Sequence, residues 1–176
     1  MNSLLSLALS VAVLGGIATW LFLSVGGILI WAAFTAWACF FHSGGNSAAL
    51  WSTIVSNAFG VLVAATTGLV IAAVPGASIF GGPLWAALAV AVSIALYILS
   101  AKAKWFASIP GTTYGYACTF AFLTQNPDKF NSHALTTLTL GNAYLVVPLS
   151  MAIGALFAYT SAGLARALEK TGPANA

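Results

Sequence analysis

The chain has 176 residues, of which 61% are hydrophobic and only 4% are charged. Soluble domains carry charges on about a quarter of their residues, so this composition predicts an integral membrane protein with the lipid bilayer as its first partner. Five basic and two acidic residues give a net charge of +3. They are too few to build a basic surface for nucleic acid or an acidic surface for metal ions.

The first half of the chain predicts three membrane-spanning helices. A helix of about 20 apolar residues crosses a bilayer, and the run 4–41 is close to twice that length, with Gly26 and Gly27 near its middle. We therefore expect two spans joined by a tight turn. A third span is expected over about 48–74, because Pro75 follows and ends it.

The second half predicts three further spans, over about 84–101, 105–124 and 136–164. Charged residues follow the last span, and a disordered tail is expected at about 171–176. The expected fold is all-α: a polytopic integral membrane protein, with a single membrane domain over 1–176 and about six transmembrane helices.

The few basic residues predict the orientation of these helices. With six spans, the loop 102–104 and the segment 166–170 lie on the same side of the membrane and hold four of the five basic residues, and only Lys129 lies on the other. Cytoplasmic loops carry the excess of lysine and arginine. Both termini are therefore expected to be cytoplasmic.

Two pairs of matching segments indicate an internal duplication. Residues 38–41 and 117–120 share the pattern Ala-Cys-x-Phe, 79 positions apart (38 to 117). Residues 56–59 and 141–144 share Asn-Ala followed by an aromatic residue, about 85 positions apart (57 to 142). This second match makes two asparagines corresponding residues.

The duplication implies an inverted repeat. Its first unit would cover about 1–80 and its second about 81–166, with three spans in each. Because three is an odd number, the two units must face opposite sides of the membrane, as in many transporters and channels. Small-residue faces on the helices favour close packing, within one subunit or in a homo-oligomer.

Asn57 and Asn142 are the first candidates for a functional site. A buried amide in hydrocarbon is costly unless its donors and acceptors are paired, so an asparagine in each unit indicates a polar path. The alternative is that each side chain hydrogen-bonds a neighbouring helix and only fixes packing. The sequence leaves both interpretations open.

Prolines mark two further places of interest. Pro148 lacks an N–H group and leaves a backbone carbonyl without its helical partner. At Pro110 and Gly111, a helix break at membrane depth would direct N–H groups and the hydroxyls of Thr112 and Thr113 toward a cavity. If the same segment lies at the membrane surface, Pro110 simply begins a helix.

Aromatic residues complete the candidate path, since rings around a shared axis form a narrow, weakly polar constriction. The alternative is that they face lipid. The residues expected to line the path are Asn57, Asn142, Thr112, Thr113, Tyr116, Trp37, Phe120 and Phe41, with backbone breaks at Pro110, Gly111 and Pro148.

Missing residue types narrow the function. No acidic or basic residue lies well inside an expected span, whereas carriers coupled to protons or sodium usually keep ionisable residues there. The sequence also offers no nucleophile-base pair, carboxylate pair or metal-ligand spacing. We therefore expect neither an enzyme nor a cofactor or metal site.

Residues 109–112, with Gly115 and 119–121, resemble a family of small bacterial inner-membrane proteins catalogued as domain of unknown function 1097. The similarity covers most of the chain, including the start at 2–5. The resemblance implies a bacterial inner-membrane location. It brings no activity and no functional residues.

The function that the sequence favours is a channel or uniporter for a small neutral polar solute such as urea, ammonia or a short amide. One alternative is a non-transporting membrane scaffold or accessory subunit, in which the asparagines and glycines serve packing alone. Another is a cation-coupled carrier that uses backbone carbonyls near Pro148 in place of acidic side chains.

Overall fold

The computed structural model describes residues 2–170, and this part of the chain is helical, without strands. The tail expected at 171–176 lies outside the described residues. In chain order the elements are α1 (Ser3–Val25), α2 (Ile30–His42), α3 (Ser47–Ala73), α4 (Ala77–Phe80), α5 (Gly82–Ser100), η1 (Lys104–Phe106), α6 (Ile109–Gln125), η2 (Pro127–Lys129), α7 (Ser132–Thr136) and α8 (Ala143–Lys170).

Polar side chains and glycines set the ends of the helices. The Asn46 side chain accepts a hydrogen bond from the backbone N–H of Ala49 at the start of α3, and Ser108 accepts one from Gly111 at the start of α6. These caps satisfy backbone donors that the helix leaves free. The expected turn between α1 and α2 is confirmed at Gly26, whose φ of 70° favours glycine.

Within the described residues, four helices are long and apolar enough to cross a membrane: α1, α3, α5 and α8. The second and fifth expected spans are shorter, because α2 has 13 residues and α6 has 17. At 1.5 Å per residue they measure about 20 and 26 Å, less than the hydrocarbon thickness of about 30 Å. The sixth expected span begins later than predicted, because Asn142 caps α8 after the separate short helix α7.

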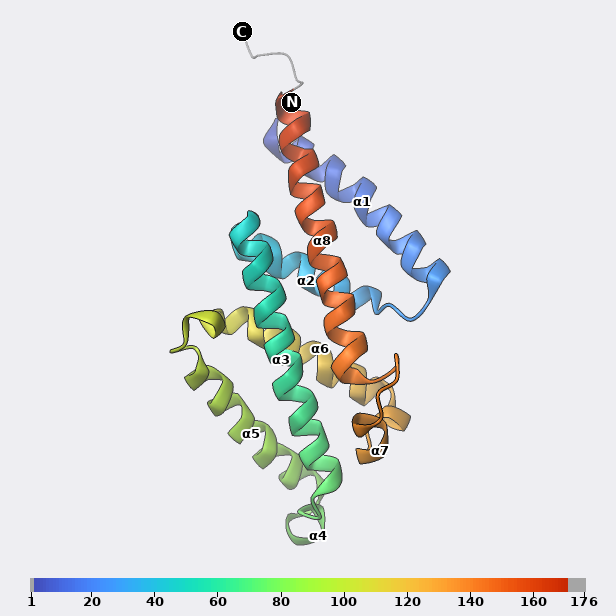
Figure 1. Ribbon diagram of the computed structural model, residues 1–176, viewed down its shortest axis with the longest axis vertical. Helices are drawn as coiled ribbons and strands as arrows, with labels where there is room; N and C mark the ends of the chain where they lie inside the picture. The colour runs from blue at the N-terminus through green and yellow to red at the C-terminus, as the bar shows by residue number, and fades with distance from the viewer. Residues whose placement is uncertain (1, 171–176) are drawn as a thin grey trace.

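The two longest helices form the centre of the molecule. Figure 1 shows α3 and α8 running in opposite directions, and they are in contact. α1 packs against α8, and α5 packs against α3. The most extensive contacts are those of α3 with α6 and of α2 with α8.

Glycines bring these helix pairs together at two close crossings. A Cβ on Gly60 of α3 would overlap the carbonyl oxygen of Thr112 on α6. A Cβ on Gly154 of α8 would overlap the carbonyl oxygen of Ala33 on α2. Ala33 and Thr112 are 79 positions apart (33 to 112), the same separation as in the Ala-Cys-x-Phe match.

Two serines show the same correspondence between the α3–α6 contact and the α8–α2 contact. Ser150 of α8 accepts a hydrogen bond from the backbone N–H of Leu29, which caps α2. Ser56 of α3 lies against the first turn of α6, where a Cβ on Gly111 would overlap its hydroxyl. Like Gly60 and Gly154, these serines are 94 positions apart (56 to 150).

These contacts relate residues of α3 to residues of α8 at a separation of 94 positions, whereas the sequence analysis predicted about 85. Asn57 lies within α3, whereas Asn142 precedes the first residue of α8. The two asparagines do not occupy corresponding places. The shared Asn-Ala pair does not mark equivalent positions, because the chain between α6 and α8 also contains η2 and α7.

Candidate functional site

The crossing of α3 and α6 buries polar side chains that have no hydrogen-bond partner. Asn57 is 1% exposed, and neither its Oδ1 nor its Nδ2 atom is paired. The hydroxyl of Thr112 is also buried and unpaired. We call Asn57 and Thr112 the α3–α6 polar cluster.

The backbone geometry explains why this cluster is enclosed. A Cβ on Gly115 would overlap the carbonyl oxygen of Asn57, just as one on Gly60 would overlap that of Thr112. The two backbones touch, and side chains between them lose access to solvent. An unpaired buried polar group costs about 1–3 kcal/mol, so the cluster lowers stability in this arrangement.

Hydroxyl pairs extend the polar region from α6 to α5. The hydroxyl oxygens of Tyr116 and Ser93 are 2.8 Å apart, and those of Thr113 and Tyr97 are 3.1 Å apart. The rings of Tyr97 and Tyr116 are 5.4 Å apart between centroids. Two predicted site residues, Thr113 and Tyr116, are thus joined by two that the sequence analysis missed.

Asn142 has a different environment. It is 4% exposed, and its Nδ2 donates to the carbonyl oxygens of Ala134, Leu135 and Thr137 at 2.8 to 3.0 Å. Its Oδ1 accepts from the backbone N–H of Tyr144 at 2.8 Å. The amide is fully paired, and it joins α7 to the start of α8. This arrangement fits the packing interpretation.

The predicted aromatic residues fall into two separate groups. Trp37 and Phe41 belong to a cluster with α1 and α8, and Trp37 stacks on Phe34 at 5.5 Å between ring centroids. Tyr116 and Phe120 belong to a cluster with α5. The four rings do not surround one shared axis, so the structure provides no single constriction made from both pairs.

The two prolines occupy different places in their helices. Pro110 is in the first turn of α6, after the cap at Ser108, where its missing N–H costs no helical hydrogen bond. Gly111 is needed there because the Ser56 hydroxyl leaves no space for a side chain. Pro148 lies inside α8, where it removes one backbone donor.

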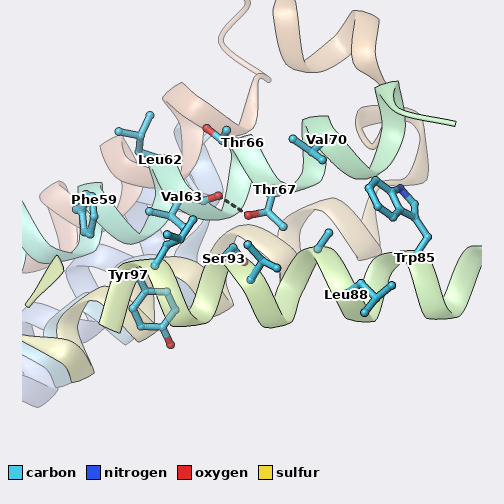
Figure 2. Close-up of a pocket in the computed structure, with 13 residues that line it drawn as sticks. Phe59, Leu62, Val63, Thr66, Thr67, Val70, Trp85, Leu88, Ser93 and Tyr97 are labelled. Carbon is cyan, nitrogen blue, oxygen red and sulfur yellow. Dashed lines mark hydrogen bonds between the residues drawn. The ribbon is translucent and has the colours of Figure 1, made fainter. Parts of the chain in front are cut away.

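A cavity of about 510 Å³ lies between α3 and α5. Figure 2 shows Phe59 and Val63 of α3 opposite Ser93 of α5, with Tyr97 near the Phe59 end and Trp85 at the far end. None of the predicted site residues lines this cavity. Its lining residues are Phe59, Leu62, Val63, Thr66, Thr67, Val70, Trp85, Leu88, Ala89, Val92, Ser93, Leu96 and Tyr97.

These features define a polytopic helical membrane protein with an uncharged polar centre and four candidate spans. The chain belongs to the family described as "Protein of unknown function (DUF1097)", whose model matches residues 8–166. The resemblance noted in the sequence is therefore confirmed. No curated protein and no solved structure matches the chain.

Proposed function

We propose that the protein is a passive facilitator for a small neutral polar solute of the urea, ammonia or short-amide type. The observation that carries this proposal is the unpaired α3–α6 polar cluster. Polar groups at membrane depth are costly without partners. A solute that pairs with them as it passes gives a reason for their presence.

The chemistry of the cluster favours an amide-like solute. Asn57 offers one acceptor and one amide donor group, and the Thr112 hydroxyl both donates and accepts. A urea or short-amide molecule carries the complementary groups. Within residues 2–169, no buried side chain is acidic or basic, so no buried charge stabilises an ion.

We further propose that the chain forms two inverted units, at about 1–80 and 81–166, with α2 and α6 as short spans, around which the bilayer is locally thinner, that complete a set of six. Support comes from the opposite directions of α3 and α8 (Figure 1) and from the matched glycine crossings. The proposal includes a bacterial inner-membrane location with both termini cytoplasmic, and a homo-oligomer.

Transport in this proposal requires the crossing of α3 and α6 to open. Asn57 and Thr112 are each 1% exposed in the structure, which therefore corresponds to a closed state. α5 is the least buried of the four candidate spans, and two hydroxyl pairs connect it to α6. Movement of α5 away from α6 would free the side chain of Tyr116, whose backbone nitrogen lies against Gly60 at the crossing.

The experiment is stopped-flow light scattering on proteoliposomes with urea, ammonia, glycerol and short amides. Flux above that of empty liposomes is expected for at least one solute, and Asn57→Leu is expected to abolish it with folding retained. Flux that is independent of sodium and proton gradients excludes the coupled carrier. If the flux of every solute equals that of protein-free liposomes, a transport role is refuted.

The second candidate is a non-transporting scaffold or accessory subunit. It is favoured by the close backbone packing at Gly60 and Gly115 and by the complete pairing of Asn142. In that case Asn57→Leu changes stability alone. The flux measurement separates the two candidates.

A further inference from the structure

The cavity between α3 and α5 forms a groove that is open along its side, and we call it the α3–α5 groove, lined by the residues given above. Apolar side chains dominate its wall, and several of them are largely exposed, including Leu62, Val92 and Leu96. Both helices are candidate membrane spans. The groove therefore faces the hydrocarbon layer, where an acyl chain can enter it.

The two ends of the groove differ in chemistry. At one end Trp85 closes it, with the indole N–H donating to the carbonyl oxygen of Ile71 at 3.3 Å. At the other end lie Tyr97 and Phe59. Beyond Tyr97, α5 ends and the chain continues into two exposed lysines, Lys102 and Lys104.

A ring contact holds these lysines beside the groove. Phe106 of η1 stacks on Phe59, with ring centroids 4.1 Å apart and an interplanar angle of 21°. Phe59 lines the groove, so the segment that carries Lys102 and Lys104 is attached to its rim. Positive charge thus lies at the end of an apolar channel.

We propose that the α3–α5 groove binds an anionic phospholipid, with one acyl chain in the groove and the phosphate at Lys102 and Lys104. Trp85 and Tyr97 are 12 positions apart on α5 (85 to 97), or about 18 Å of helix. This is close to the depth of one leaflet, about 15 Å. Lysines at the membrane surface attract anionic headgroups.

Charge favours a lipid over a second copy of the chain as the occupant. The sequence contains two acidic residues, Asp128 and Glu169. Asp128 already pairs with Lys129 at 3.4 Å, and Glu169 is at the end of α8. A second copy would bring an apolar helix but little negative charge for Lys102 and Lys104.

The test uses the full-length protein in phosphatidylcholine vesicles that contain a trace of photoreactive lipid, either phosphatidylglycerol or phosphatidylcholine. Mass spectrometry maps the crosslinks. Phosphatidylglycerol is expected to label groove residues of α3 and α5 several-fold more than phosphatidylcholine does. Lys102→Gln and Lys104→Gln are each expected to lower this labelling about five-fold.

Matched variants give the controls. Lys129→Gln removes the same charge elsewhere and is expected to leave the labelling unchanged. Ala89→Phe fills the groove and lowers labelling by both lipids, whereas Ala91→Phe, at an exposed position on α5 outside the lining, does not. Because the lysines are exposed, their variants test the proposal even if Ala89→Phe fails to fold.

Three results would overturn the proposal. The first is equal labelling by the two lipids, and the second is equal loss in Lys129→Gln. The third is labelling at background level together with disulfide-linked dimers of Val92→Cys, which would show that a second copy occupies the groove.

Discussion

The most direct test of the polar cluster is Thr112→Val, which replaces an unpaired hydroxyl by a methyl group of nearly the same shape. Thr112 is 1% exposed and its Oγ1 atom has no hydrogen-bond partner. Removing an unpaired buried hydroxyl relieves a desolvation penalty of about 1–3 kcal/mol. We therefore expect the free energy of unfolding to rise, and the melting temperature with it by about 2–4 °C for each kcal/mol.

Thr119→Val is the matched control on the same helix. Thr119 is also fully buried, but its hydroxyl donates to the carbonyl oxygen of Gly115 at 2.9 Å. The same substitution there removes an existing hydrogen bond, so stability is expected to be unchanged or to fall by up to about 1 kcal/mol. The opposite signs of the two changes identify the unpaired group.

Flux measurements on the same two variants connect stability to function. If the solute pairs with the Thr112 hydroxyl, Thr112→Val removes a hydrogen bond of about 0.5–1.5 kcal/mol and lowers flux about 2–10-fold. Thr119→Val is expected to retain flux. A more stable Thr112→Val with unchanged flux would refute the transport role of this hydroxyl, and a less stable one would show that the hydroxyl has a partner.

Three further predictions concern the packing and the topology. Gly60→Ala places a Cβ on a backbone carbonyl and is expected to lower the free energy of unfolding by about 1–3 kcal/mol. Gly163→Ala is the control, because Gly163 has open space around it, and it should stabilise α8 slightly. Equal melting temperatures for the two variants would contradict the close crossing of α3 and α6. Asn142→Leu leaves three carbonyls and one N–H without their partner and is expected to cost at least about 2 kcal/mol in chemical unfolding, a loss that a merely lipid-facing residue would not show. In a cysteine-free background, Val25→Cys and His42→Cys are expected to react with impermeant maleimides from opposite sides of the membrane, and labelling from one side only would show that α2 does not cross.

The sequence predicted the class of protein well, because the proportion of apolar residues in a chain reflects whether lipid or water surrounds it. Long apolar runs identify α1, α3, α5 and α8 whatever their neighbours are. The turn at Gly26 was also predictable, because a positive φ is a local demand on one residue. Helix length was less predictable, because a cap such as Asn142 acts through side-chain contacts that hydropathy does not describe.

The candidate site was predictable only in part. Asn57 and Thr112 stand out as polar residues in apolar segments, and the structure buries both at one helix crossing. Ser93 and Tyr97 were missed, although they lie four residues apart on a largely apolar helix and face α6. That spacing was the available signal, but recognising it required knowing which helix packs beside α5.

Asn57 and Asn142 were predicted to be equivalent, but their environments differ for a physical reason. An asparagine at the start of a helix can hydrogen-bond backbone groups that the helix leaves free, whereas an asparagine in mid-helix is next to backbone groups that the helix already pairs. Asn142 finds carbonyls in the chain just before it, whereas both polar atoms of the Asn57 side chain are buried without a partner. The position relative to the helix end decides which amide is satisfied.

The glycine crossings also have a consequence for biogenesis. Gly60, in the part of the chain that is synthesised first, packs on Thr112, and Ala33 packs on Gly154, which is synthesised near the end. Neither half therefore completes its own interior, and the nascent protein must keep narrow, glycine-lined faces unfilled until translation is nearly finished. Fragments divided near residue 80 should mature only when both are produced together in one membrane.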